Sequence, residues 1–198
     1  MDVVKRIPMG AGLGGGSSDA ATCLQALNRL WSLGLPTQRL AQIGLELGAD
    51  VPVFVHGRAA FAEGVGERLT PLLPPTAPRE CNYLILKPNV FISTALVFQD
   101  PELTRNSLPI TIRDFLASGG RNDCEGVVRR RYPEVARAID WLSQFGEARL
   151  TGTGACVFLA LDSAGRGREI MSMLPAEFEA FLVRGLNRSP LLDRLSAA

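Results

Sequence analysis

Five glycines fall within seven residues near the start of the chain: Gly10, Gly12, Gly14, Gly15 and Gly16. A backbone without Cβ atoms can approach a ligand closely and turn several N–H groups toward one point. Residues 3–9 before the run read as a short strand, and a helix pattern follows it. We therefore predict a phosphate-binding loop made of Pro8, Met9, Gly10, Ala11, Gly12, Leu13, Gly14, Gly15, Gly16, Ser17 and Ser18.

The helix after the loop strengthens this prediction. Ser17, Ser18 and Asp19 offer N-cap side chains. Apolar residues follow at helical spacing as far as Trp31, and Gly34 and Pro36 end the pattern. A helix N-terminus carries unpaired N–H donors and a partial positive charge, which suits phosphate oxygens. A merely flexible glycine turn is the plainer alternative, but it does not require a strand before it and a capped helix behind it.

Two better-known phosphate loops fit less well. A P-loop ends in Gly-Lys-Ser/Thr, and the chain has no lysine between Lys5 and Lys87. The spacing of Gly10, Gly12 and Gly15 matches the dinucleotide fingerprint. That fingerprint needs an acidic residue about 20 positions further on, and residues 26–36 contain none. A nicotinamide-binding dehydrogenase thus remains a minor alternative.

Composition excludes several other classes. A formal net charge of +1 predicts no nucleic-acid partner and no attraction to an acidic membrane. No apolar run reaches membrane-spanning length and the first residues lack a signal peptide, so we expect a cytoplasmic protein. The four cysteines lack the spacing of a zinc site or a disulfide framework, and we assign no metal ligands.

Helix and strand patterns alternate along the whole chain without a repeat, which predicts an α+β fold. A second helix is expected over residues 37–47, and short strands near residues 51–56, 59–64 and 67–72. A proline-rich connector, residues 71–80, suggests a boundary that separates residues 1–75 from residues 76–198. The second part should begin with a strand at 83–88 and end with a strand at 178–184. Between them we expect a short helix within residues 92–100 capped by Ser93 or Thr94, helices near 111–118, 124–132, 133–145 and 164–174, and a strand–turn–strand at 149–161.

Several segments resemble one family. Residues 8–18, PMGAGLGGGSS, are similar to the second motif of the GHMP kinases, which are named for galactokinase, homoserine, mevalonate and phosphomevalonate kinases. Residues 149–158, RLTGTGACVF, resemble the third motif. With LGADVPVF, AAFAEGVGE and NDCE, the chain resembles the branch that phosphorylates the 2-hydroxyl of a cytidyl-diphosphate-linked methylerythritol in non-mevalonate isoprenoid synthesis.

The resemblance implies a GHMP-kinase-like fold of two subdomains that binds ATP with Mg²⁺. Asp50, in the Gly-Ala-Asp-Val-Pro turn, stands where the family has the aspartate that acts at the substrate hydroxyl. A turn-forming aspartate is the alternative for it. Ser17 and Ser18 could ligate Mg²⁺ as well as cap the helix. The resemblance places the remaining substrate contacts at Thr94, Phe98, Gly152, Thr153 and Gly154. An ordinary core aromatic is the equal alternative for Phe98, and a tight β-turn is the alternative for residues 152–154.

The family's first motif, which contributes a lysine and an asparagine, has no counterpart here, and Lys5 does not replace that lysine. We therefore expect an incomplete N-terminal subdomain, weak turnover by this chain alone, and self-association through an open sheet edge. Two further functions stay open: phosphorylation of another small molecule by a GHMP kinase, and nucleotide binding without turnover.

Overall fold

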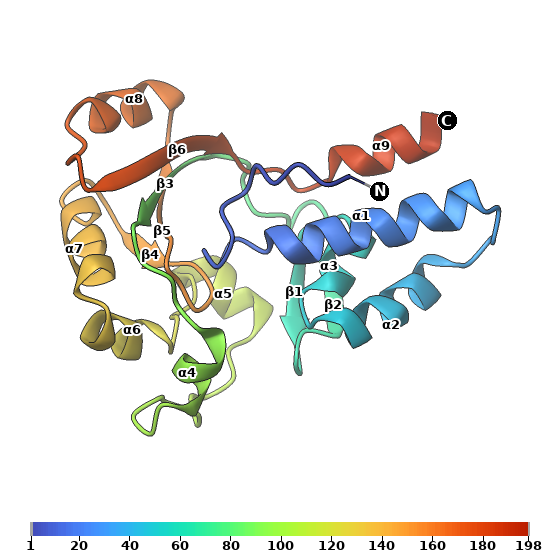
Figure 1. Cartoon of the computed structure of the whole chain (residues 1–198), viewed down its shortest axis with the longest axis horizontal. Helices are drawn as coiled ribbons and strands as arrows, with labels where there is room; N and C mark the ends of the chain where they lie inside the picture. Colours follow the sequence, from blue (N-terminus) through green and yellow to red (C-terminus); the bar gives the residue numbers. More distant parts are fainter. Residues whose placement is uncertain (1, 198) are drawn as a thin grey trace. The chain divides into compact units, whose positions relative to one another are not determined.

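The computed structural model describes residues 2–197, which form an interleaved set of helices and strands (Figure 1). This mixture confirms the predicted α+β class. The chain divides into two compact units. One unit joins the chain up to Leu13 with Glu80–Gly185, and we call it the sheet unit; the other joins Gly14–Arg79 with the chain from Leu186 onward, and we call it the helical unit. The junctions between the two units fall inside the glycine loop, after Arg79 and after Gly185. The division into residues 1–75 and 76–198 stays a prediction.

The sheet unit is built on four antiparallel strands in the order β4-β5-β3-β6. The central strand β3 pairs with β5 on one side and β6 on the other, so Leu84 lies opposite both Leu159 and Leu182. Successive side chains of a strand point to opposite faces of the sheet, and β3 has buried residues at alternate positions. The strands are β3 (Asn82–Pro88), β4 (Ala148–Leu150), β5 (Val157–Leu161) and β6 (Phe178–Arg184).

Two helices pack on the sheet and form the main core. Leu84 and Leu86 on β3 are fully buried, as are Leu142 on α7 and Ile170 on α8, and all four belong to one apolar cluster. Full burial of such a side chain is worth about 1.5–3 kcal/mol. The helices of this unit are α4 (Thr94–Gln99), α5 (Ile112–Ser118), α6 (Glu125–Arg131), α7 (Pro133–Leu142) and α8 (Ala164–Ser172).

The helical unit has a smaller core between three helices. Its buried residues include Ala21 on α1, Leu40 on α2 and Val55 on α3. A two-stranded hairpin and the last helix complete the unit. Its elements are α1 (Gly15–Leu30), α2 (Thr37–Leu47), α3 (Val51–His56), β1 (Ala60–Glu63), β2 (Arg68–Pro71) and α9 (Pro190–Ala197).

The strand predicted near residues 51–56 is wrong, because this segment is helix α3. Alternating valines favoured a strand, yet Val51 and Val55 lie one helical turn apart and pack together into the helical core. Gly44 on α2 permits this contact, since a Cβ there would lie 2.7 Å from the side chain of Val51. Pro52 occupies the first helical turn, where its missing N–H costs nothing.

The strand predicted before the glycine loop is also wrong. Residues 2–7 form no strand, and the side chains of Val3 and Val4 are exposed. A strand is stable only when its backbone groups are paired, and no described strand pairs with this segment.

At the other end of the chain, helix α9 was not predicted from the sequence. It is attached to the helical unit by backbone bonds such as Ser189 N–H to the carbonyl of Gly57.

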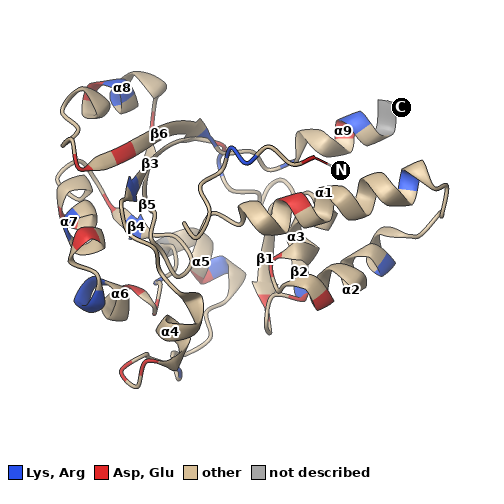
Figure 2. Cartoon of the chain, in the orientation of Figure 1, with Lys and Arg blue, Asp and Glu red and all other residues tan. Residues whose placement is uncertain are grey.

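The basic run at residues 129–131 lies on α6, which Figure 2 shows as the blue end of that helix. The three guanidinium groups are about half exposed and face carboxylates of the same unit. Each arginine therefore pairs with a carboxylate of the sheet unit: Arg129 with Asp140, Arg130 with Glu102, and Arg131 with Asp100.

Asp100 gives this helix a pH-dependent anchor. Its carboxylate is 3% exposed, accepts the Glu102 N–H at 2.9 Å, and pairs with Arg131 and, at 3.3 Å, with Arg130. The Glu102 N–H first, and then the two arginines, hold the pKa of Asp100 below its usual value, although burial opposes them. Because the folded-state pKa is depressed, the carboxylate stabilises the fold above the unfolded-state pKa, about 3.9. That stabilisation is lost as the pH falls through the folded-state value.

We therefore expect the urea midpoint of the chain to fall more steeply below about pH 4 than the midpoint of Asp100→Asn. The variant has no carboxylate to protonate at this position, so the difference between the two curves isolates this group. Midpoints measured by circular dichroism from pH 7 downward would check this. If the two plots of urea midpoint against pH were parallel, the Asp100 carboxylate would not contribute to the pH dependence of stability.

Candidate active site

The first half of the glycine loop packs against the turn that follows β4. The carbonyl of Ala11 accepts the backbone N–H of Cys156 at 3.2 Å, and the Thr151 hydroxyl donates to the carbonyl of Gly12 at 2.7 Å. Gly12 has φ +70°, and a Cβ there would overlap the carbonyl oxygen of Thr151. The structure thus brings the two glycine-rich segments together, and Gly12 is required by the closeness of their backbones.

The turn after β4 is closed by its own backbone. Thr151 N–H donates to the carbonyl of Cys156 at 3.0 Å, and Gly154 N–H donates to the carbonyl of Thr151 at 2.8 Å. Gly152 and Gly154 have φ values of +54° and +86°, which side chains rarely adopt. Burial raises the pKa of the Cys156 thiol to about 12, so this cysteine is a neutral packing residue beneath the turn.

The second half of the loop begins the helical unit. Gly14, at φ +65° and ψ +13°, is the N-cap residue of α1, and its carbonyl accepts the N–H of Ser18 at 2.9 Å. The capping role predicted for Ser17, Ser18 and Asp19 is therefore wrong, because the helix starts two residues before Ser17. No side chain of the described residues caps it. The first turn of α1 therefore begins without an N-cap side chain, and binding of phosphate there stays a prediction.

Asp50 lies at the N-cap position of α3 and is exposed. Its carboxylate makes no cap bond, and no ion pair or hydrogen bond to it is found within residues 2–197. The turn that holds it is backed by the β1–β2 loop, where a Cβ on Gly66 would lie 2.9 Å from the carbonyl of Ala49. Four residues after Asp50, the ring of Phe54 approaches Gly14, so one short helix connects the carboxylate to the loop.

The predicted substrate residues of the sheet unit also meet. The hydroxyls of Thr94 and Thr153 are 2.9 Å apart, which joins the start of α4 to the turn after β4. Phe98 lies four positions after Thr94, hence on the same side of α4, and is 55% exposed. Arg105 donates to the carbonyl of Phe98 at 2.6 Å and steadies the end of the helix. An exposed aromatic ring next to polar hydroxyls suits a planar base with polar edges.

Sequence reasoning missed three residues of this region. The ring of Phe91 lies against Gly10, Thr151 binds Gly12, and Asn122 binds the turn after β4. NDCE, which contains Asn122, was noticed as a motif, but its contact spans 30 residues of sequence. Thr151 lies within the quoted segment 149–158 but was given no role, and Phe91 carried no signal of its own.

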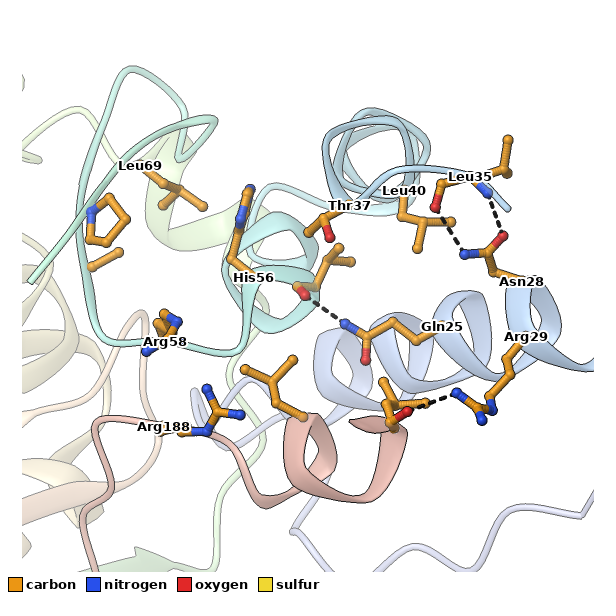
Figure 3. Close-up of a pocket in the computed structure, with 15 residues that line it drawn as sticks. Gln25, Asn28, Arg29, Leu35, Thr37, Leu40, His56, Arg58, Leu69 and Arg188 are labelled. Carbon is orange, nitrogen blue, oxygen red and sulfur yellow. Dashed lines mark hydrogen bonds between the residues drawn. The ribbon is translucent and has the colours of Figure 1, made fainter. Parts of the chain in front are cut away.

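A separate cavity of about 660 Å³ lies within the helical unit (Figure 3). His56, the single histidine of the sequence, lines it at the end of α3 instead of ending a strand. In the close-up the Gln25 amide donates to the carbonyl of Val55 at 2.5 Å, and Arg29 donates to the carbonyl of Leu195 on α9 at 2.7 Å. None of the predicted site residues lines this cavity.

Comparisons with known proteins agree with the motifs. The family described as GHMP kinases N terminal domain matches residues 1–58, and GHMP kinases C terminal matches residues 102–180. The 4-diphosphocytidyl-2-C-methyl-D-erythritol kinase of Nitrosococcus oceani is 56% identical over 191 residues, covering 96% of this chain and 67% of the relative. The kinase of the same name from Thiobacillus denitrificans is 55% identical over 189 residues, covering 96% of this chain and 66% of the relative. The chain thus spans about two thirds of the length of these curated relatives.

Solved structures show the same relationship. A crystal structure of 4-(cytidine 5'-diphospho)-2C-methyl-D-erythritol kinase superposes with a TM-score of 0.73 at 34% identity, covering 91% of this chain and 68% of that one. The homoserine kinase of Cytophaga hutchinsonii, with a TM-score of 0.70 at 13% identity over 93% of this chain and 69% of that one, shares the fold. Motifs, family patterns and fold lead to one conclusion: this chain belongs to the GHMP kinases.

Proposed function

We propose that this protein transfers the γ-phosphoryl group of ATP to the 2-hydroxyl of 4-diphosphocytidyl-2-C-methyl-D-erythritol, a step of isoprenoid synthesis. The observation that carries the proposal is the glycine loop, with Ala11 and Gly12 bound to the turn after β4 and an uncapped helix starting at Gly15. Two relatives of that name match nearly the whole chain at 55% and 56% identity, which supports this choice of acceptor.

The loop would hold the triphosphate through backbone donors. N–H groups of the first turn of α1 have no partner within the helix, and the helix dipole adds a partial positive charge at that end. Such donors need no reorganisation when negative charge shifts during transfer, which is the main way that proteins assist phosphoryl transfer. Ser17 and Ser18, inside the first turn, would add hydroxyl contacts to the phosphates.

Asp50 would accept the proton of the acceptor hydroxyl. In the reaction the acceptor oxygen forms a bond to the γ-phosphorus, the bond between that phosphorus and the β–γ bridging oxygen breaks, and ADP leaves with its electron pair. A carboxylate already committed to an ion pair would be a poor base, whereas Asp50 is exposed and makes no such pair within the described chain. Its place at the start of α3, with Gly66 behind the turn, limits its movement.

Residues of the sheet unit would bind the acceptor. The hydroxyls of Thr94 and Thr153 form a polar pair, and the exposed ring of Phe98 lies on the same helix face as Thr94. A cytosine ring could stack on Phe98 while its sugar and phosphates reach the polar pair and the turn at Gly152 and Gly154.

Mg²⁺ would enter with the nucleotide as Mg·ATP. Within residues 2–197 no three His, Cys, Asp or Glu side chains gather in a way that could hold a metal ion. Mg²⁺ does not need a cluster of protein ligands, because it keeps several waters and binds mainly through substrate phosphates. The Ser17 and Ser18 hydroxyls are the donors we would assign to it.

A panel of acceptors tests the proposal. The 198-residue chain is incubated with Mg·ATP and the cytidyl substrate, mevalonate or homoserine, and phosphorylated products are identified by mass spectrometry. We expect phosphate on the cytidyl substrate alone, and none on the same compound lacking its 2-hydroxyl. Phosphorylated mevalonate or homoserine without phosphorylated cytidyl substrate would select another GHMP kinase activity.

Two further proposals concern where the protein acts and whether it self-associates. Within residues 2–197 no helix is long and apolar enough to span a bilayer, and we propose that the protein acts in the cytoplasm. The β1–β2 hairpin forms a two-stranded sheet, and no third strand within residues 2–197 joins it, so we also propose self-association through a sheet edge. Light scattering over a range of concentrations would detect it.

A further inference from the structure

Asn122 binds the turn after β4 through both functions of its amide. Its Nδ2 donates to the carbonyl of Gly152 at 2.7 Å and to the carbonyl of Leu150 at 3.1 Å. Its Oδ1 accepts the backbone N–H of Cys124 at 3.0 Å. The opposite amide orientation would set an oxygen against two carbonyls, so these partners determine which way the side chain points.

The two carbonyls that Asn122 binds belong to the residues on either side of Thr151. Thr151 in turn donates its hydroxyl to the carbonyl of Gly12, and its own carbonyl lies so close to Gly12 that a Cβ would not fit. A small rotation of the peptides around Thr151 would therefore move its hydroxyl away from the loop, and Asn122 opposes that rotation from both sides.

We propose that Asn122 is a positioning residue for ATP: it fixes the turn containing Thr151 and so sets the shape of the glycine loop. This inference rests on the proposed function, because it assigns the loop to the nucleotide. Asn122 need not touch ATP; it acts through Thr151 on Gly12. The same turn carries Thr153, whose hydroxyl meets that of Thr94, and loss of Asn122 would disturb that side as well.

Asn122→Asp is the sharpest variant. It keeps the shape of the side chain and the acceptor for the Cys124 N–H, but it removes both donors and places a carboxylate oxygen against the two carbonyls. Asp123→Asn is the matched control, because the Asp123 carboxylate in the same segment binds Ser107 and Arg121 and not the turn. One variant replaces an amide with a carboxylate and the other replaces a carboxylate with an amide at the next position, so both change the side chain by the same two groups.

Two measurements on the 198-residue chain test the proposal. Hydrogen exchange followed by mass spectrometry reports the peptide containing the Gly154 and Cys156 N–H groups, which are bonded to Thr151 and Ala11. Titration with Mg·ATP reports nucleotide affinity, and steady-state kinetics report the KM values of ATP and acceptor. For Asn122→Asp we expect faster exchange in this peptide and about 10- to 100-fold weaker ATP binding, seen as a higher KM for ATP with a smaller rise in the KM of the acceptor. For Asp123→Asn we expect neither change.

An unchanged hydrogen-exchange rate in Asn122→Asp would overturn the proposal that Asn122 stabilises the turn after β4. Faster exchange with unchanged ATP affinity would overturn its role in positioning the loop. Failure of the chain to phosphorylate any acceptor would instead count against the proposed function, and the exchange and binding measurements would still decide the part of Asn122.

Discussion

Replacing Asp50 with asparagine is expected to lower the turnover number about 10²- to 10⁴-fold while leaving ATP affinity unchanged. Asparagine has nearly the same shape but cannot accept the proton of the attacking hydroxyl. The carboxylate is exposed and caps no helix, so its loss should cost little stability. Initial rates with the cytidyl acceptor, calorimetric titration with Mg·ATP and thermal unfolding would measure the three quantities separately.

Glu46→Gln is the matched control for this change. Glu46 is another exposed carboxylate of the helical unit, on α2, so both substitutions remove one negative charge from the same unit. Turnover of this control should remain that of the unaltered chain. Equal turnover in Asp50→Asn would remove Asp50 from the chemistry. A chain that binds ATP but transfers no phosphate, with Asp50 present or replaced, would favour a nucleotide-binding module.

Replacing Gly12 with alanine should have the second large effect, on both stability and ATP binding. The new Cβ would overlap the carbonyl of Thr151 and lie 2.9 Å from the carbonyl of Gly154, and φ +70° is unfavourable for alanine. The conformation alone costs about 1–2 kcal/mol. Relief of the overlap requires the loop and the turn after β4 to separate, which breaks the bond from the Thr151 hydroxyl. We expect at least about 100-fold weaker ATP binding.

Gly16→Ala separates this effect from a general sensitivity of the glycine run. Gly16 lies in the first turn of α1, and nothing lies within 4 Å of the position of its Cβ. Alanine there should raise stability by about 0.5–1 kcal/mol, because glycine is the poorer helix former. Urea unfolding of both variants would show the contrast. A Gly12→Ala chain as stable as Gly16→Ala would contradict the close approach of loop and turn.

Local sequence patterns predicted much of the fold. The helix over residues 37–47 and the strand over residues 178–184 occur with the predicted bounds. Each carries its own signals: apolar residues at helical spacing before Gly48 in one, and a run rich in apolar residues after a turn in the other. The glycine run also identified the family, because its unusual composition and its order relative to the other motifs are properties of sequence alone.

The errors arose where packing overrode local preference. Residues 51–56 have the valines of a strand, yet Gly44 leaves room for them to pack as a helix. Residues 2–7 have strand composition, but composition cannot supply a pairing partner. The cap of α1 was misplaced because Gly14 adopts a left-handed conformation that the side chains of Ser17 and Ser18 do not reveal.

The sequence by itself determined the class of fold, the family and the position of the loop, since these depend on residue types at short spacing. Only the tertiary structure decided that Thr151 binds Gly12 and that Asn122 brackets Thr151, contacts that span 139 residues and 30 residues of sequence. Such contacts form when distant segments pack, because a hydrogen bond depends on the distance and angle between its groups, which their spacing along the chain does not specify.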